Sequence, residues 1–157
     1  MEVLDLLGSA GATLATAESL TGGRLAAVVT TVPGASVSYL GGFVTYATRL
    51  KESLLGVPPD LVERYGVVSA ECASAMASGC REATGATYAL ATTGVAGPDE
   101  QEGKPVGTVF VGLSGPEGET VLTMELLGDR PGIQDRACRE ALSALCGILR
   151  GEQPPLG

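Results

Sequence analysis

Three side chains within one short stretch of the chain could together carry nucleophilic chemistry. Ser36 lies in the turn 32–36, Tyr46 ends an expected strand, and Lys51 follows five residues later in an expected helix. A neutral lysine amine can activate a serine hydroxyl as an alternative to histidine. Such a lysine needs its pKa lowered by roughly three units from about 10.4, through burial or a nearby positive charge. The spacing alone leaves a turn serine and a solvated lysine as the alternative interpretation.

The absence of histidine narrows the chemistry further. None of the 157 residues is His, which excludes Ser-His-Asp and Cys-His catalysis and every His-ligated metal site. The cysteines form two pairs, Cys72 with Cys80 and Cys138 with Cys146, each separated by eight residues. On one helix that spacing spans roughly 12 Å, too far for a disulfide or a shared metal. We therefore expect free, packed thiols, no metal and no cofactor.

Two glycine-rich turns could offer backbone N–H groups to a ligand. Residues 18–24 join an expected strand to an expected helix, whose N-terminus favours an anion such as phosphate. Residues 92–98 follow another strand in the same way, but neither turn is a Walker A or GxGxxG motif, so a plain capped turn is the alternative. Lys104 and Arg130 are the loop cations best placed to pair with an anion. The candidate binding residues are Glu18, Ser19, Thr21, Gly22, Gly23, Thr93, Gly94, Ala96, Gly97 and Arg130.

Strands that alternate with helices must position these groups. We expect helices over 2–8, 24–29, 48–55, 60–65, 70–83 and 133–149, and strands over 13–17, 42–46, 88–93, 107–113 and 120–127. Ser69 is the expected N-cap of the helix over 70–83, and the last two strands are expected to form a hairpin. This order predicts an α/β fold, a three-layer α/β/α sandwich with a mixed, mostly parallel sheet. Both glycine turns then lie at the carboxyl ends of strands, where open α/β sheets bind ligands.

Composition sets the broad class of protein. We expect a single domain over 1–150 and a flexible tail over 151–157, because 45% of the residues are hydrophobic and evenly spread. The net charge of -8 argues against a nucleic-acid partner, which needs clustered Lys and Arg. No apolar run reaches the roughly 18 residues of a membrane span. Glu2 and Asp5 lie where a signal peptide needs positive charge, so we expect a cytoplasmic protein with reduced cysteines.

Several motifs, taken in order, resemble one known family. They are residues 17–23 (AESLTGG), 33–36 (PGAS), 42–46 (GFVTY) with Lys51, 55–57 (LGV), 65–69 (YGVVS), 93–98 (TGVAGP) and 104–109 (KPVGTV). The family is the C-terminal domain of the competence/damage-inducible protein CinA, also found as the stand-alone nicotinamide-nucleotide amidohydrolase PncC. The resemblance extends from about residue 3 to residue 150.

The resemblance implies a metal-independent amidohydrolase that deamidates nicotinamide mononucleotide to nicotinate mononucleotide and ammonia, in pyridine nucleotide recycling. It places the family's catalytic serine, tyrosine and lysine on Ser36, Tyr46 and Lys51. Leu20 stands where many members have Cys, and Gln134 where members often have Arg, so Arg130 is the residue expected to hold the substrate phosphate.

The expected partner is therefore a small-molecule substrate, nicotinamide mononucleotide, with neither nucleic acid nor membrane as partner. We also expect a homo-oligomer, with a dimer favoured. Two other functions stay open on the sequence alone: a non-catalytic nucleotide-binding accessory module in competence or DNA damage, and a sugar-phosphate or nucleotide hydrolase of different specificity. Release of ammonia from nicotinamide mononucleotide would separate the first of these from an amidohydrolase.

Overall fold

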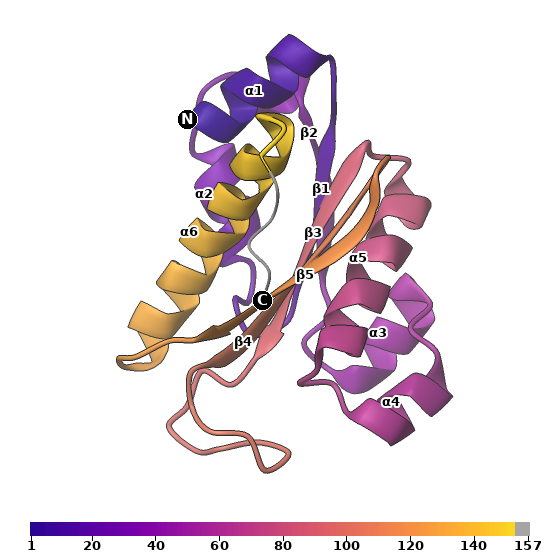
Figure 1. Cartoon of the computed structure of the whole chain (residues 1–157), viewed down its shortest axis with the longest axis vertical. Coiled ribbons are helices and arrows are strands. Elements are labelled where there is room, and N and C mark those ends of the chain that lie inside the picture. Colours follow the sequence, from indigo (N-terminus) through magenta and orange to yellow (C-terminus); the bar gives the residue numbers. More distant parts are fainter. Residues whose placement is uncertain (153–157) are drawn as a thin grey trace.

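A computed structural model describes residues 1–152 of the chain, in which helices cover both faces of one sheet (Figure 1). The elements are α1 (Glu2–Ala10), β1 (Leu14–Glu18), α2 (Arg24–Thr30), the short 3-10 helix η1 (Ala35–Val37), β2 (Tyr39–Val44), α3 (Thr48–Leu55), α4 (Pro59–Tyr65), α5 (Ala70–Thr84), β3 (Tyr88–Gly94), β4 (Thr108–Gly115), β5 (Gly118–Glu125) and α6 (Arg130–Leu149).

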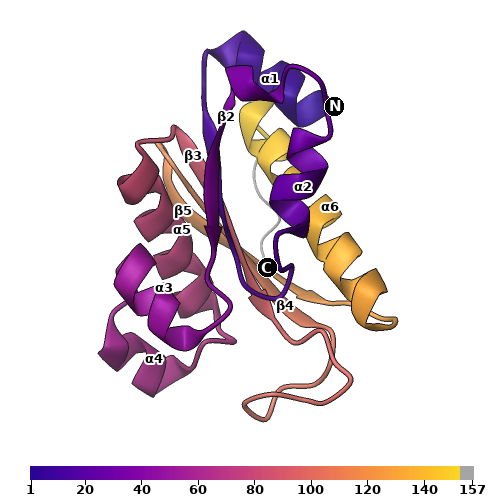
Figure 2. The same ribbon diagram turned by 180° about the vertical axis from the view of Figure 1, so that it is seen from behind.

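The sheet has the strand order β2-β1-β3-β4-β5. β1 pairs in parallel with both β2 and β3, whereas β4 runs antiparallel to its neighbours β3 and β5. Helices α1, α2 and α6 lie on one face of the sheet, and α3, α4 and α5 lie on the other (Figures 1 and 2). The expected three-layer α/β/α sandwich with a mixed sheet is confirmed, and β4 is the one strand of the five that opposes the rest.

Alternating residues of the central strands divide the core between the two faces. Leu14 and Leu90 belong to the cluster under α1 and α6, whereas Ala15 and Ala89 belong to the cluster under α5. The small side chains on the second face let α5 lie close to the sheet. At Gly112 of β4, a Cβ atom would come within 2.1 Å of a backbone oxygen of α5, so no larger residue fits there.

The observed bounds of β2 correct one expectation that matters for the site. The strand was expected over 42–46 but runs from Tyr39 to Val44, because pairing with β1 begins at Tyr39. Gly42 lets the two strands approach, since a Cβ atom there would lie 2.1 Å from the carbonyl oxygen of Thr16. Tyr46 therefore follows the strand rather than ending it.

Other boundaries follow local capping. α3 spans the expected residues, and Ser69 caps α5 by accepting a hydrogen bond from the backbone N–H of Cys72. α1 continues through Gly8 and ends at Ala10, and the next residue, Gly11, has a positive φ of 62° that is typical of a C-cap. α6 begins earlier than expected because Asp129 caps it, with a proline in the first turn.

The far end of the chain and the cysteines complete the fold. Gly151 and Glu152, expected to be part of a flexible tail, still donate backbone hydrogen bonds to carbonyls of α6, and the remaining tail residues 153–157 lie outside the described residues. All four cysteines are buried and free, as expected, on α5 and α6. Within residues 1–152, no helix has the length and apolar character needed to cross a membrane.

Candidate active site

Lys51 is a lysine buried almost completely beneath the carboxyl edge of the sheet. Only 1% of it is exposed, on the inner face of α3. Its Nζ lies 2.9 Å from Ser19 Oγ and donates to the backbone oxygens of Thr45, at 2.6 Å, and Tyr46, at 3.3 Å. Burial lowers the pKa of this amine, and this effect outweighs the attraction of the Glu102 carboxylate. Burial therefore disfavours the charged form of an amine that contacts a serine hydroxyl.

The parallel sheet brings Ser19 and Lys51 together although they are far apart in sequence. Ser19 follows the last residue of β1, and its N–H donates to the carbonyl of Thr92 on β3 at 3.0 Å. Glu18 is paired with Val44, the last residue of β2, so the chain leaving β2 passes beside Ser19 before it enters α3. Ser19 and Lys51 therefore meet at the carboxyl edge, where α/β sheets bind ligands.

Ser36 lies near the amino end of β2, whereas Lys51 lies beyond its carboxyl end, and the two residues are not in contact. Ser36 belongs to η1, which precedes β2, and its side chain is exposed. Lys51 comes after β2, and a six-residue strand separates its two ends by roughly 17 Å. The expected contact between Ser36 and Lys51 is thus replaced by the contact between Ser19 and Lys51. Ser19 was expected only to bind substrate.

A cavity of about 160 Å³ opens directly above Ser19 and Lys51. Its lining includes these residues of the expected site: Ser19, Tyr46, Lys51, Thr93, Gly94, Ala96, Gly97 and Arg130. Leu20, Thr48, Val67, Val68, Val95, Asp99 and Gln101 also line it and were not expected. The second glycine turn therefore does form a wall of the cavity. Thr48, Asp99 and Gln101, polar residues outside this turn that no motif had indicated, also line it.

Arg130 lies across the mouth of this cavity. Its guanidinium donates to the carbonyl oxygen of Gly97 at 2.5 Å and to the hydroxyl oxygen of Tyr46 at 3.0 Å. The Tyr46 hydroxyl is thus engaged with Arg130, and only the backbone carbonyl of Tyr46 contacts Lys51. The geometry places Tyr46 with the cation at the rim, not between Ser19 and Lys51 as a proton relay.

The first glycine turn is occupied by the protein's own carboxylate. Glu18 is 1% exposed, and its oxygens accept hydrogen bonds from Thr21 Oγ1 at 2.7 Å and from the backbone N–H groups of Gly23 at 3.1 Å, Leu25 at 2.8 Å and Ala26 at 3.1 Å. These N–H groups form the N-terminus of α2, which was expected to hold a substrate phosphate. Glu18, Thr21, Gly22 and Gly23 therefore support the turn from within, and none of them lines the cavity.

Backbone N–H groups around the cavity are left available to a ligand. Among residues 1–152, no acceptor takes the N–H of Leu20, Ala96 or Gly97, and all three residues line the cavity. Unengaged donors next to a nucleophile are the groups that stabilise a developing oxyanion. Thr93, by contrast, turns its hydroxyl away to donate to the carbonyl of Val67 at 2.7 Å.

Two supporting contacts were not foreseen from the sequence. Gln134, buried on α6, donates to the carbonyl of Leu20 at 2.9 Å and so holds the residue next to Ser19. Glu102 accepts from the backbone N–H groups of Val67, at 3.0 Å, and Val68, at 2.7 Å, and joins the 99–104 loop to the cavity wall. For Gln134 the only signal in the sequence was a polar residue on the apolar side of a helix, which is weak by itself.

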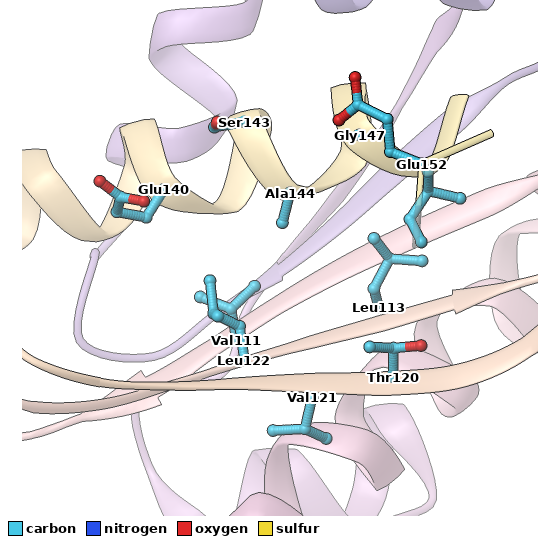
Figure 3. A pocket seen from close by; sticks show the side chains of 11 residues that line it. Val111, Leu113, Thr120, Val121, Leu122, Glu140, Ser143, Ala144, Gly147 and Glu152 are labelled. Atoms are coloured by element: carbon cyan, nitrogen blue, oxygen red, sulfur yellow. The ribbon is translucent and has the colours of Figure 1, made fainter. Parts of the chain in front are cut away.

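A second cavity, of about 250 Å³, lies between α6 and the β4–β5 hairpin (Figure 3). Its lining is mainly aliphatic, with Val111, Leu113 and Leu122 on the strands and Glu140 and Glu152 at its margin. Among the described residues that line it, there is no lysine that could activate a nucleophile. Within residues 1–152, no group of three or more His, Cys, Asp or Glu is gathered as a metal site would require. The chemistry is therefore best placed at the Ser19–Lys51 cavity.

Comparison with known proteins identifies the family. The sequence matches the CinA C-terminal domain over residues 1–149, and the chain belongs to this family. It is 53% identical over 149 residues to a CinA-like protein of Frankia casuarinae, covering 95% of this chain and 34% of that protein. A CinA-like protein of Solibacter usitatus is 45% identical over 148 residues, covering 94% of this chain and 36% of that protein. The chain thus spans about a third of the length of these relatives.

Solved structures of the same superfamily share the fold along nearly the whole chain. The competence-damaged protein (CinA) superfamily protein from Klebsiella pneumoniae superposes with a TM-score of 0.93 at 32% identity, covering 96% of this chain and 94% of that one. The competence/damage inducible protein CihA from Agrobacterium tumefaciens gives a TM-score of 0.87 at 32% identity, with 96% of each chain covered. The family indicated by the sequence motifs is confirmed, and this chain is a relative of competence/damage-inducible proteins.

Proposed function

We propose that this chain is an amidohydrolase that deamidates nicotinamide mononucleotide, with Ser19 as nucleophile and Lys51 as its base. The observation that carries the proposal is the contact of 2.9 Å between the buried Lys51 amine and Ser19 Oγ at the floor of a cavity. Membership of the CinA C-terminal domain family supports the substrate class, because the family's motifs resemble those of nicotinamide-nucleotide amidohydrolases.

Acylation begins with a proton transfer from serine to lysine. In neutral Lys51, two N–H bonds donate to the carbonyls of Thr45 and Tyr46, so the lone pair is directed at the Ser19 hydroxyl. Lys51 takes that proton as Ser19 Oγ forms a bond to the carboxamide carbon. The negative charge on the carboxamide oxygen is stabilised by the unengaged N–H groups of the cavity wall, such as that of Leu20.

Ammonia leaves when the carbon–nitrogen bond breaks and the Lys51 ammonium returns its proton to the departing nitrogen. The product is an ester between the nicotinoyl carbonyl and Ser19. A water molecule then gives a proton to Lys51 and attacks the ester carbon, and the Ser19 oxygen leaves and recovers its proton from Lys51. The new carboxylic acid gives its proton to solvent, and nicotinate mononucleotide is released as the carboxylate. Each step uses the same amine alternately as base and acid.

The charges around the cavity suit the two ends of this substrate. A pyridinium ring over the floor disfavours protonation of Lys51, which adds to the effect of burial on its pKa. Arg130 at the mouth presents a guanidinium that can exchange its contacts with Gly97 and Tyr46 for a phosphate monoester. The positive charge of Arg130 at the cavity mouth is sufficient to attract the phosphate, although the chain as a whole carries a net charge of -8.

The deciding experiment measures ammonia released from nicotinamide mononucleotide by three purified proteins. The unmodified chain and the Ser36→Ala control should both turn over, whereas Ser19→Ala should lose on the order of 10³-fold or more in kcat. Binding of the nucleotide without any release of ammonia by the unmodified chain would favour a non-catalytic nucleotide-binding module. Equal activity in Ser19→Ala and the unmodified chain would remove Ser19 as the nucleophile.

A further inference from the structure

The loop between β3 and β4 folds back on itself as a tight turn beside the cavity. Gln101 and Lys104 exchange backbone hydrogen bonds, at 3.2 and 2.9 Å, around Glu102 and Gly103. Both central residues have a positive φ, of 54° and 72°. Among residues 1–152, Glu102 is the one residue other than glycine in this conformation, which a residue with a side chain keeps only where its surroundings hold it. We refer to residues 101–104 as the 101–104 turn.

Side chains of the 101–104 turn hold the backbone that connects α4 to α5. The Glu102 carboxylate accepts from the backbone N–H groups of Val67 and Val68, and the Lys104 amine donates to the carbonyl oxygen of Val68. Gly66 leaves room for this contact, because a Cβ atom there would lie 2.6 Å from a Glu102 carboxylate oxygen. Val67 and Val68 both line the cavity. The 101–104 turn therefore fixes part of the cavity wall.

Lys51, on the floor of the same cavity, has no ion-pair partner. Its amine contacts the Ser19 hydroxyl and the carbonyl oxygens of Thr45 and Tyr46. Among residues 1–152, no carboxylate touches this amine, and neither of the salt bridges in that part of the chain involves it. If Lys51 takes a proton, the charge that forms has to be stabilised by a group that is not in contact with it.

The titratable and charged groups around Lys51 leave one carboxylate for this role. They are Cys72 on α5, Glu102 and Lys104 in the 101–104 turn, and Tyr46, Asp99 and Arg130 in the lining of the cavity. Burial raises the pKa of Cys72 to about 11, so its thiol is uncharged at working pH. The Glu102 carboxylate supplies the negative charge that opposes the effect of burial on the pKa of Lys51.

We propose that Glu102 is a positioning residue, which fixes the wall at Val67 and Val68 and supplies the counter-charge for Lys51 once this amine has taken the Ser19 proton. The inference rests on the proposed function, in which Lys51 alternates between amine and ammonium. The carboxylate is already held by its hydrogen bonds before the proton moves, so its charge needs no reorganisation when the ammonium forms. Because it does not touch the amine, Lys51 stays free to contact Ser19.

Loss of this charge has two consequences for the reaction. Without the carboxylate the ammonium form is less stable, so the pKa of Lys51 falls further and the neutral base is present at lower pH. The same change makes Lys51 a weaker base toward the Ser19 hydroxyl. Glu102→Gln should therefore move the rising limb of kcat to lower pH and reduce its plateau. A residue that only supported the wall would reduce activity without moving the limb.

NMR of a chain with isotope-labelled lysine Cε measures the ionisation of Lys51 without any substrate. Lys51 and Lys104 are the only lysines of the sequence, and the spectrum of Lys51→Met identifies the Lys51 signal. The midpoint of the Lys51 titration should lie at lower pH in Glu102→Gln than in the unmodified chain. Glu100→Gln is the matched control, because Glu100 is exposed in the same loop and does not line the cavity. This variant should titrate like the unmodified chain.

An unchanged Lys51 midpoint in Glu102→Gln, or an equal displacement in Glu100→Gln, would overturn the inference. Residues 99–104 lie outside both core clusters, so Glu102→Gln should fold, and circular dichroism checks this. Kinetics with nicotinamide mononucleotide keep the two proposals apart. A chain that releases no ammonia contradicts the proposed function, and the titration still decides the role of Glu102. A midpoint that moves while the kcat limb stays supports the counter-charge and removes Lys51 as the base.

Discussion

Lys51 combines two properties that rarely occur together in a lysine, almost complete burial and a serine hydroxyl as a hydrogen-bond partner. Its long side chain crosses the layer between α3 and the sheet, and its amine emerges only at the floor of the cavity. A charged amine there would lose most of its hydration, so burial lowers its pKa. The neutral form that can accept a proton is therefore more accessible in Lys51 than in a solvated lysine.

The activity should depend on pH through the ionisation of Lys51. Only the neutral amine can accept the Ser19 proton, so kcat should rise as pH increases through the lowered pKa of Lys51 and level off above it. Lys51→Arg keeps a positive charge that does not dissociate at working pH, and Lys51→Met removes the base. We expect both variants to be nearly inactive from pH 6 to 9 in steady-state assays. An arginine variant with substantial activity would show that Lys51 orients the substrate and that another group is the base.

Arg130 should contribute to substrate binding more than to turnover. Loss of a charge-assisted contact to phosphate typically costs about 1.5–3 kcal/mol, so Arg130→Ala should raise KM by roughly 10- to 100-fold with a much smaller effect on kcat. Arg136→Ala, on an exposed side of the same helix, is the matched control and should behave like the unmodified chain. The measurement is a full kinetic comparison with nicotinamide mononucleotide and with nicotinamide riboside, which lacks the phosphate. If Arg130→Ala lowers the efficiency for both compounds equally, Arg130 does not recognise the phosphate.

At the scale of elements, the turn between β1 and α2 is organised by Glu18 rather than by a ligand. Its carboxylate accepts hydrogen bonds from the first turn of α2 and reaches them from the last position of β1. A negative group at a helix N-terminus is stabilising, and here the protein supplies it internally. The same turn leaves Ser19 beside Lys51, so the carboxylate holds the strand end that presents the proposed nucleophile.

Replacement of this carboxylate should weaken the fold. Glu18→Gln removes the charge and replaces one carboxylate oxygen with an NH2 group that cannot accept from a backbone N–H, and we expect the free energy of unfolding to fall by about 1.5–3 kcal/mol. Urea unfolding followed by circular dichroism measures the change. Glu63→Gln, at an exposed site on α4, should leave the midpoint of unfolding nearly unchanged. Equal stability of Glu18→Gln and the unmodified chain would mean that the helix end does not depend on the carboxylate.

Local patterns predict the elements of this chain better than they predict the site. The bounds of α3, the cap of α5 and the β4–β5 hairpin depend on residues close together in sequence, and capping and turn residues indicate them. The choice between Ser19 and Ser36 depends on strand order, because β1 and β2 are parallel and Lys51 follows β2. Both serines lie near glycine turns, and spacing to Lys51 favoured Ser36, whereas the side chain that contacts Lys51 is that of Ser19.

At the scale of the whole molecule, burial makes the four cysteine thiols unreactive. It raises the pKa of Cys72 to about 11 and those of Cys80 and Cys138 to about 12, and it also raises the pKa of Cys146. At pH 8 the reactive thiolate is therefore a minor species in the folded chain. We expect very slow reaction with a disulfide reagent under native conditions and complete labelling of all four in guanidinium chloride. Rapid native labelling of Cys72 or Cys80 would show that α5 opens from the sheet.

Helix α6 contributes to a site whose proposed nucleophile, Ser19, follows the first strand. Arg130 begins α6 at the cavity mouth, and Gln134, one turn later, holds the carbonyl of Leu20 from the opposite end of the sequence. During synthesis, Ser19 and Lys51 leave the ribosome long before either of these partners has been made. A nascent chain, or one truncated within the hairpin, would carry the nucleophile and its base without the cation and amide that complete their surroundings. Activity on the proposed substrate should then begin only when translation has passed α6.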